Sequence, residues 1–323
     1  MAKAKMLFWG GIVASLLMSS VVANAESIKT QSVINLWPAD GVGPGSQGSP
    51  AQLTVTERSK VPFWPDRVVT GITRPNLTAF VPDRPNGVAV IAAPGGAYGR
   101  IVLDKEAAEM ARWLNPYGVT VFLLQYRLPG EGHANGADVP LQDGQRAIRV
   151  VRQHAKEWGL DPNRIGLLGA SAAGHLAASV GAEFDKKVYE AQDDADKLSA
   201  RPDFLLLLYP VVTMETGYTH LETRDNLLGK DPSAERIAAY SPDLHITKDS
   251  PKTFIVLADD DPFVPSENAI RYFQGLKKVG VQAELHIFKD GGHGFGIRDT
   301  RQLPVSAWPN LAIDWMKSNG ILK

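Results

Sequence analysis

The stretch IGLLGASAAGHL, from Ile165 to Leu176, limits the possible folds of this chain more than any other. A short apolar run, Ile165 to Leu168, follows a turn signal and predicts a buried strand. Small residues come next, with Ser171 at their centre, and apolar residues at helical spacing follow directly. A strand, a sharp turn carrying a serine and then a helix are the context of a nucleophile elbow, in which the serine hydroxyl projects above a sheet.

The residues on either side of the serine test this interpretation. In an elbow, the residues two before and two after the serine face each other where strand and helix cross, so both must be small. Here they are Gly169 and Ala173. The usual pattern is Gly-x-Ser-x-Gly, so Ala173 adds one methyl group at a crowded point. The alternative is an ordinary strand-to-helix turn in which Ser171 caps the helix.

The rest of the chain predicts alternating strands and helices. Apolar runs bounded by turn signals predict strands, and apolar residues at helical spacing predict helices. We expect strands at residues 67–70, 77–81, 87–93, 119–125, 165–168, 204–208, 253–257 and 281–288. We expect helices at residues 104–114, 141–158, 266–279 and 307–319. This alternation is typical of an α/β fold, with a mostly parallel, doubly wound sheet and helices on both faces.

Three segments interrupt the alternation. Residues 26–65 are rich in glycine, proline and serine and predict an irregular arm on the surface. The sequence from Pro82 to Gly87 predicts a hairpin turn between the strands on either side of it. Residues 211–247 are polar and carry helix fragments such as 233–239, so we expect them to form a cap insertion over the strand ends.

The first 25 residues have the features of a cleavable signal peptide. A short basic end precedes an uncharged apolar run at residues 6–18, and Ala23-Asn24-Ala25 is a small-x-small cleavage site. The run is too short to span a bilayer comfortably. We therefore expect cleavage after Ala25, a single domain over residues 26–323, a secreted or periplasmic location and no stable membrane insertion after cleavage.

Composition limits the classes of partner. The formal net charge of −1 gives no reason to expect a polyanionic partner such as nucleic acid. The chain has no cysteine, so a disulfide or a thiolate metal site is impossible. Its seven histidines are scattered and show no His-Glu-x-x-His spacing, so we expect neither a metal nor a cofactor. The oligomeric state is not indicated.

A serine nucleophile needs a base to take its proton and an acid to orient that base. In doubly wound sheets, functional groups collect in loops at the carboxyl ends of strands. The expected strand 253–257 leads into three consecutive aspartates, Asp259, Asp260 and Asp261. One of them is a candidate acid, and the others can be solvated acids of a turn or of a helix N-terminus.

His293 is the candidate base. It lies between glycines in the loop after the strand 281–288, and it follows Ser171 and the aspartates in the order that the elbow motif requires. The alternative for any single loop histidine is a structural or solvated side chain. Among the other histidines, His286 alternates within a strand and His175 follows the elbow on its helix.

The loop after the strand 87–93 is the candidate oxyanion hole. Its sequence, Pro94-Gly-Gly-Ala-Tyr98, contains glycines that let backbone amides turn toward a ligand without side-chain clash. The alternatives are a plain glycine-rich turn or a phosphate-binding loop. The loop has neither Gly-x-Gly-x-x-Gly nor Gly-x-x-x-x-Gly-Lys, which disfavours the phosphate interpretation.

Six short motifs resemble those of one known superfamily. They are PGGAY at 94–98, YRLP at 126–129, PLQDGQRAIR at 140–149, GASAAGHL at 169–176, DDPFVP at 260–265 and GGHGFG at 291–296. Together they resemble the α/β-hydrolase superfamily, and more closely its acetyl-xylan-esterase-like branch of secreted esterases. The resemblance covers roughly residues 34–323.

This resemblance implies a role for each matching residue. Ser171 corresponds to the nucleophile, His293 to the base and Asp261 to the orienting acid, since the acid of the family stands three residues before the valine of Val-Pro, here Val264.

The resemblance also implies an oxyanion hole made by the backbone amides of Gly96, Ala97 and Ala172. The sequence departs from the family at Ala97 and Ala173, where glycine is usual. A backbone amide survives the change from glycine to alanine, so these departures are compatible with catalysis, and they suggest a tighter acyl pocket or an altered substrate preference.

We therefore expect a serine carboxylic ester hydrolase that removes small acyl groups, acetyl in particular, from carbohydrate such as xylan oligosaccharides. The alternatives on the same fold are a non-carbohydrate carboxylesterase and a serine peptidase. A binding protein that has lost the chemistry is a further alternative, disfavoured because all three triad residue types are present. Trp37, Trp64 and Trp308 are candidates for a sugar platform, although most tryptophans serve packing.

Overall fold

The computed structural model describes residues 30–300 and 302–323. The expected signal peptide, residues 1–25, lies outside this part of the chain. None of the helices in the described residues has the length and apolar character needed to cross a membrane. The buried apolar side chains of the described residues form one continuous core.

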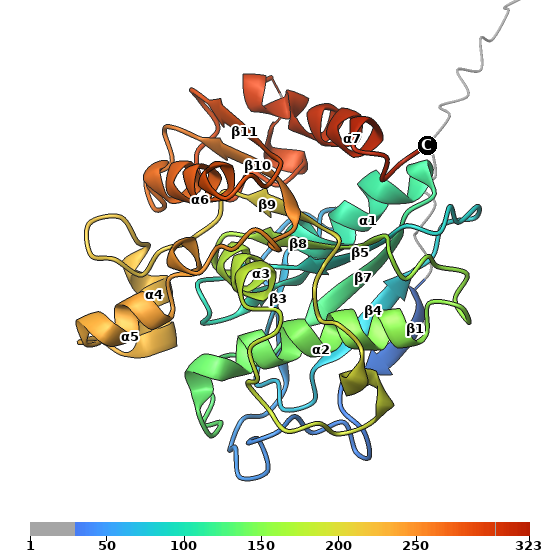
Figure 1. Ribbon diagram of the computed structural model, residues 1–323, viewed down its shortest axis with the longest axis vertical. Coiled ribbons are helices and arrows are strands. Elements are labelled where there is room, and N and C mark those ends of the chain that lie inside the picture. Colours follow the sequence, from blue (N-terminus) through green and yellow to red (C-terminus); the bar gives the residue numbers. More distant parts are fainter. Residues whose placement is uncertain (1–29, 301) are drawn as a thin grey trace, which may run out of the picture.

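Within the described residues, eight strands form the main sheet (Figure 1). In spatial order they are β1 (Thr30–Asn35), β4 (Asn76–Phe80), β7 (Thr120–Gln125), β5 (Ala89–Ala93), β8 (Ile165–Ala170), β9 (Phe204–Leu208), β10 (Lys252–Ala258) and β11 (Ala283–Phe288). β4 runs antiparallel to both of its neighbours, and the remaining pairs are parallel. The predicted mostly parallel sheet is therefore confirmed, and every expected strand from 77–81 onward corresponds to one of these.

Helices cover both faces of the sheet, as the alternation predicts. They are α1 (Glu109–Leu114) with the preceding π-helical turn η1 (Asp104–Ala108), α2 (Val139–Gln153), α3 (Ala172–Ala182), α6 (Glu267–Lys278) and α7 (Trp308–Ser318). The connections β5–α1–β7 and β7–α2–β8 progress in opposite directions along the sheet, so right-handed crossovers place α1 and α2 on opposite faces. α7 packs against α1 through Trp113 and Trp308, whose ring centroids lie 4.8 Å apart.

The strand order reverses between β5 and β8. The next strand after β5 in the chain, β7, lies on one side of it, and β8 lies on the other. Ligands of doubly wound sheets bind at the carboxyl ends of strands where the order reverses in this way. The loop after β5 and the turn after β8 both lie at this place.

The predicted hairpin at Pro82–Gly87 is wrong. β4 and β5, the strands on either side of it, are not neighbours, because β7 lies between them and pairs with both. The turn is present, but it connects two strands that each pair with β7 and not with one another. A local turn signal contains no information about a strand that comes 30 residues later.

The N-terminal arm is more regular than predicted. It contains β1, which forms one edge of the main sheet, and β2 (Thr54–Glu57). β2, β3 (Arg67–Thr70) and β6 (Ile101–Val102) form a separate antiparallel sheet. Leu36 and Trp37 follow β1 and are buried in the core, which anchors the arm to the domain. The rest of the arm consists of turns, as its glycine and proline content indicates.

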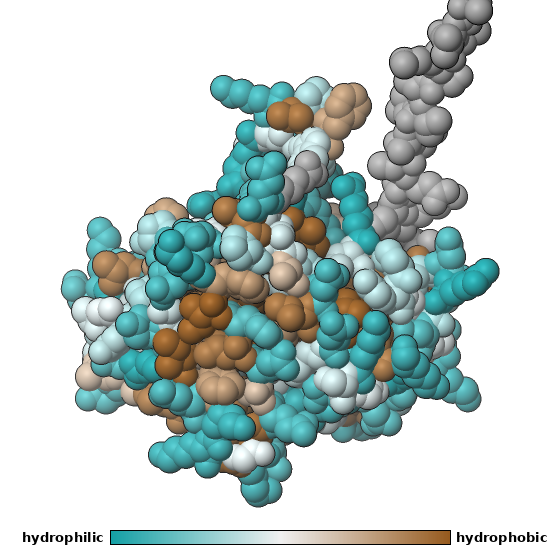
Figure 2. Space-filling model, turned by 90° about the horizontal axis from the view of Figure 1, so that it is seen from above, coloured by the Kyte–Doolittle hydropathy of each residue, from teal (hydrophilic) through white to brown (hydrophobic). Residues whose placement is uncertain are grey.

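Residues 211–247 connect β9 to β10 and contain α4 (Leu221–Leu228), α5 (Ala234–Ala239) and a 3₁₀ turn, η5 (Pro242–Leu244). In Figure 1 the two helices stand at the left edge of the molecule, beside the sheet rather than within its layers. The side-chain amide of Asn226 in α4 donates to the carbonyl oxygen of Ala97 at 2.8 Å, so this segment contacts the loop after β5. Figure 2 shows a second view, in which hydrophilic side chains surround a central group of apolar ones.

Candidate active site

Ser171 occupies the turn between β8 and α3 with φ 53° and ψ −121°. A residue other than glycine held at positive φ costs about 1–3 kcal/mol, which the surrounding structure must offset. Three backbone hydrogen bonds hold the turn. The amide of Ser171 donates to Leu208 at 3.0 Å, and its carbonyl oxygen accepts from Gly174 at 2.9 Å and Val211 at 3.0 Å. The residue therefore has the strained geometry of an elbow, not that of a simple helix cap, and its side chain makes no capping hydrogen bond.

The crossing of strand and helix explains the small residues around Ser171. A Cβ atom placed on Gly169 would lie 2.2 Å from the carbonyl oxygen of Ala173 and 2.7 Å from the Cβ of Ala177. Such a contact is impossible without moving α3 away from β8. Ala173 is fully buried at the same crossing, where its backbone, not its methyl group, lies closest to Gly169.

The structure brings Ser171, His293 and Asp261 together in one line of hydrogen bonds. The hydroxyl Oγ of Ser171 lies 2.9 Å from Nε2 of His293, and Nδ1 of His293 lies 2.6 Å from Oδ2 of Asp261. The side chain of Asp261 is 1% exposed and that of His293 is 16% exposed, so solvent reaches the imidazole but hardly reaches the carboxyl group. This is the geometry in which a carboxylate orients an imidazole that can take a proton from a serine.

The three consecutive aspartates have separate roles. Besides contacting His293, Asp261 accepts hydrogen bonds through Oδ1 from the amides of Phe263 and Val264, both at 2.9 Å. Asp260 accepts from the amides of Gly291 and Gly292 and so holds the loop that leads to His293. Asp259 is exposed to solvent. The sequence left the choice among the three open, and only Asp261 contacts the imidazole.

The candidate oxyanion loop lies directly beside Ser171. A Cβ atom placed on Gly95 would lie 2.9 Å from the Cβ of Ser171. The backbone then turns through positive φ at Gly96 (132°), Ala97 (54°) and Tyr98 (59°). In the part of the chain that the structure describes, no acceptor takes a hydrogen bond from the amides of Gly96 and Ala97.

The third predicted oxyanion amide belongs to Ala172, the first residue of α3. The first amides of a helix have no partner within the helix, and the helix dipole favours negative charge there. Ala172 directly follows Ser171, and Gly96 and Ala97 follow Gly95, whose added Cβ would contact Ser171. Whether they bind an oxyanion remains a prediction.

Two residues that hold this loop were not found from the sequence. Glu106 is buried, and its carboxyl group accepts from the amide of Gly95 at 2.6 Å and from the hydroxyl of Tyr209 at 3.0 Å. Asn226 binds the carbonyl oxygen of Ala97, as described above. Neither residue belongs to a recognisable motif. A glutamate or an asparagine in a helix is commonly a solvent-exposed side chain, so the sequence gives no sign that these two have a structural role.

Aromatic and imidazole rings surround His293. Tyr209, Phe263 and His220 have ring centroids 5.1, 5.8 and 6.4 Å from the centroid of His293. His220 comes from the segment between β9 and β10, and its Nδ1 contacts the hydroxyl of Thr223. Burial, and next the nearby imidazole of His293, lower the pKa of His220. The neutral form of His220 is therefore favoured beside the candidate base.

His175 is not part of this cluster, although it lies one helical turn from Ser171. Its Nε2 donates to the carbonyl oxygen of Tyr240 at 2.7 Å, so its Nδ1 accepts from the hydroxyl of Tyr98 at 2.8 Å. Burial lowers the pKa of His175 to about 4. His175 thus joins the oxyanion loop to the end of α5 as a neutral structural group.

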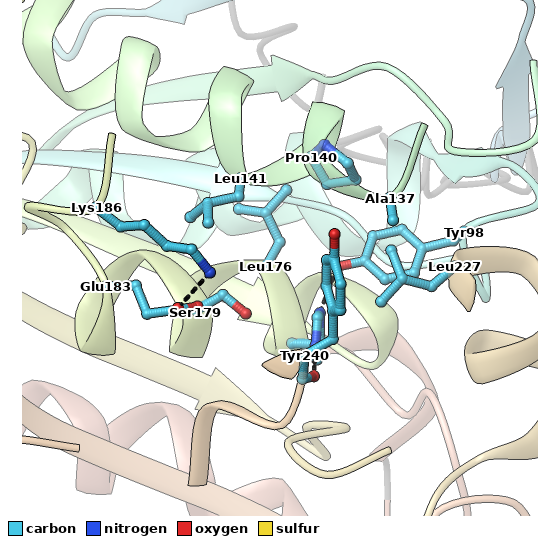
Figure 3. Close-up of a pocket in the computed structure, with 11 residues that line it drawn as sticks. Tyr98, Ala137, Pro140, Leu141, Leu176, Ser179, Glu183, Lys186, Leu227 and Tyr240 are labelled. Atoms are coloured by element: carbon cyan, nitrogen blue, oxygen red, sulfur yellow. Dashed lines mark hydrogen bonds and ion pairs between the residues drawn. The ribbon is translucent and has the colours of Figure 1, made fainter. Parts of the chain in front are cut away.

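A small hollow, shown in Figure 3, lies between α2, α3 and the segment between β9 and β10. Tyr98, Leu227 and Tyr240 point into it from one side, and Glu183 and Lys186 pair at its other end. Its volume is about 10 Å³, room for roughly one water molecule. Ser171 does not line this hollow, and the volume leaves no room for a substrate.

The described residues contain no group of three histidine, aspartate or glutamate side chains arranged to hold a metal ion. All three of the predicted triad residues are accounted for by hydrogen bonds to one another and to backbone amides. The arrangement can therefore deliver an activated hydroxyl to an electrophilic carbon such as that of a carbonyl group.

Comparisons with a family model and with known proteins agree on one family of esterases. The family model described as BD-FAE matches residues 82–276. An acetylxylan esterase of Xylanibacter ruminicola is 32% identical over 249 residues, which are 75% of this chain and 48% of that protein. An endo-1,4-beta-xylanase B of Butyrivibrio fibrisolvens is 29% identical over 69% of this chain and 35% of its own length. The chain thus spans about half or less of the length of these two relatives.

A solved structure resembles nearly the whole chain. It is that of an acetyl ester-xyloside bifunctional hydrolase from Caldicellulosiruptor lactoaceticus, with 33% identity and a TM-score of 0.75 over 93% of this chain and 100% of the other. A carboxylesterase from Lactobacillus plantarum, at 22% identity and a TM-score of 0.65, shares the fold. With the strand order above, these likenesses confirm the predicted α/β-hydrolase fold.

Proposed function

This chain belongs to the BD-FAE family, and from that premise we propose that it is a serine carboxylic ester hydrolase removing small acyl groups, acetyl in particular, from carbohydrates such as xylan oligosaccharides. The observation that carries the proposal is the line of hydrogen bonds from Ser171 through His293 to Asp261. The names of the relatives support the substrate class, because they refer to acetyl esters and to xylan or xylosides.

In the proposed reaction, Oγ of Ser171 attacks the carbonyl carbon of the ester while Nε2 of His293 takes the hydroxyl proton. The ester C–O bond then breaks, and the imidazolium gives the proton to the leaving sugar alkoxide. Asp261 keeps the imidazole oriented and stabilises its charged form through the 2.6 Å contact to Nδ1. Water, activated by the same imidazole, then hydrolyses the acyl-enzyme, releases the acid and restores Ser171.

Backbone amides stabilise the charge that develops on the ester oxygen. The proposed donors are the amides of Gly96, Ala97 and Ala172. Ala172 directly follows Ser171, and Gly95, which precedes Gly96, lies against Ser171. Each donor of this kind typically contributes about 2.7–4 kcal/mol to the transition state. Ala97 carries a methyl group where the family usually has glycine, and we propose that it narrows the acyl pocket and so favours a small acyl group such as acetyl.

The test is hydrolysis of acetylated xylo-oligosaccharides and of a short activated ester by the wild type and by Ser171→Ala. We expect the wild type to release acetate from the oligosaccharide and the variant to lose more than about 10³-fold in kcat on both substrates, since the nucleophile is gone. Thermal unfolding checks that the variant is folded.

Each outcome decides one part of the proposal. Unchanged turnover by a folded Ser171→Ala variant refutes the nucleophile assignment. Cleavage of the activated ester without release of acetate from the oligosaccharide keeps the esterase chemistry and removes the carbohydrate assignment. Faster cleavage of aminoacyl amides than of either ester would establish a peptidase instead.

A further inference from the structure

An open groove lies between the loop that joins β2 to β3 and the turns that carry Lys105 and Arg298. Its volume is about 430 Å³, within the range of small-molecule sites. Trp64 and Val61 of the β2–β3 loop form its apolar part, and Asp66, Lys105, Arg298 and Asp299 are among its polar lining. None of these residues takes part in the proposed chemistry.

Trp64 differs from the other two tryptophans considered for a sugar platform. Trp37 is 2% exposed and Trp308 is 0% exposed, so both belong to the core. Trp64 is 37% exposed and lines the groove. The guanidinium carbon of Arg298 lies 5.5 Å from the centroid of its ring.

Other contacts hold this aromatic wall in place. Arg298 donates to the carbonyl oxygen of Pro65 at 2.9 Å and pairs with Glu109. Trp64 therefore stands on a backbone that is tied to the turn after β11. An indole fixed in this way loses little conformational freedom when a ligand packs on it, which favours binding.

The charged groups of the groove are paired with partners of opposite sign. Asp66 pairs with Arg58 at 2.8 Å, Lys105 pairs with Asp299, and Arg298 pairs with Glu109. A groove whose charges are already balanced gives no net attraction to an anion or a cation. It offers instead an aromatic surface rimmed by hydrogen-bonding groups, which suits an uncharged ligand carrying many hydroxyl groups.

Two lining residues of the groove are close along the chain to residues of the candidate active site. Lys105 precedes Glu106, which holds the amide of Gly95 in the oxyanion loop. Arg298 follows His293 by five residues, a distance that the chain cannot stretch beyond about 18 Å. These two segments lie against each other, since a Cβ atom placed on Gly296 would be 3.3 Å from the side chain of Lys105.

From this geometry we infer that the groove at Trp64 binds a sugar ring of the oligosaccharide while the acetylated ring lies at Ser171. This inference rests on the proposed function and names the part of the substrate that the groove contacts. The C–H face of a pyranose packs on the indole of Trp64, and the ring hydroxyls bind the polar groups of the rim. The contribution appears only with a substrate long enough to reach both places.

The test compares Trp64→Ala with the wild type on a short activated ester and on acetylated xylo-oligosaccharides of increasing length. We expect an unchanged kcat/KM on the short ester and, on the longest oligosaccharide, a fall of roughly 3- to 12-fold caused by a higher KM, the loss expected for one aromatic contact. Trp64→Phe should recover part of the loss. Phe63→Ala is the matched control, since Phe63 is the neighbouring residue, is 90% exposed and does not line the groove.

Binding of unacetylated xylotetraose to Ser171→Ala, measured by calorimetry with and without Trp64→Ala, separates the groove from the chemistry. Weaker binding in the double variant supports the groove, even if the wild type releases no acetate and the proposed function fails. Equal binding and equal kcat/KM in all variants overturn the groove and leave the proposed function standing. An equal loss on the short ester and on the oligosaccharides also overturns it, because Trp64 would then act through the fold.

Discussion

Replacing Glu106 tests whether the oxyanion loop depends on its buried support. The carboxyl group of Glu106 is the acceptor for two donors, the amide of Gly95 at 2.6 Å and the hydroxyl of Tyr209 at 3.0 Å. Glu106→Ala leaves both donors buried without a partner. At about 1–3 kcal/mol for each unsatisfied donor, we expect the free energy of unfolding to fall by about 2–6 kcal/mol.

The same substitution should reduce turnover. Gly95 precedes Gly96 and Ala97, whose amides are proposed oxyanion donors, so a loop without its contact to Glu106 loses part of their alignment. Complete loss of one oxyanion donor costs about 10²- to 10³-fold in kcat. We expect Glu106→Ala to lower kcat on a short activated ester by about 10- to 10³-fold, with a smaller change in KM.

Glu106→Gln provides the measurement if the alanine variant does not fold. Its carbonyl oxygen can still accept from Gly95, and its amide group can donate to the hydroxyl of Tyr209, so the cost is about 1 kcal/mol in stability. Glu109→Gln is the matched control, since Glu109 lies one turn further and pairs with Arg298 instead of the loop. A folded Glu106→Ala variant with the kcat of the wild type would refute the support that we assign to Glu106.

Two further substitutions test the elbow and the helix behind it. Gly169→Ala should lower the free energy of unfolding by more than about 3 kcal/mol, because its Cβ would lie 2.2 Å from a backbone oxygen; a stability within 1 kcal/mol of the wild type in urea unfolding would contradict this. His175→Gln tests the pH dependence of the free energy of unfolding. Burial lowers the pKa of His175 from 6.5 to about 4, so the stability that depends on neutral His175 is present above pH 6.5 and is lost as the pH falls toward 4. Between pH 7 and pH 4 the wild type should lose about 3 kcal/mol more than the variant, and parallel stability profiles would show that His175 does not titrate in this way.

The positions of the strands could be predicted from the sequence, but which strands lie side by side in the sheet could not. Apolar runs identified β5, β8, β9 and β10, because a strand buried on both faces leaves an unbroken run of apolar residues. The pairing of strands depends on contacts between distant segments. For this reason the turn at Pro82–Gly87 was assigned to a hairpin, whereas β7 lies between the two strands.

In the candidate site, too, some residues could be predicted from the sequence and others could not. Ser171, His293 and Asp261 stand in loops after strands, with small or repeated neighbours that mark them in the sequence. Glu106 and Asn226 act on backbone atoms of another segment, so their types and spacing show nothing unusual. Only the folded chain shows that Glu106 is buried and what it holds.

The separation of the site residues along the chain has a consequence for folding. Ser171 and His293 are 122 residues apart, and the loop at Gly95 lies a further 76 residues before Ser171. No single segment contains both a nucleophile and its base, so a growing chain acquires the complete site only after β11 has been added to the sheet. Contacts of such long range form slowly, because closing long loops costs entropy before the contacts form. The proposed ester hydrolysis therefore requires the loop after β11, and its recovery during refolding would follow the docking of β11 rather than the formation of β8 and α3.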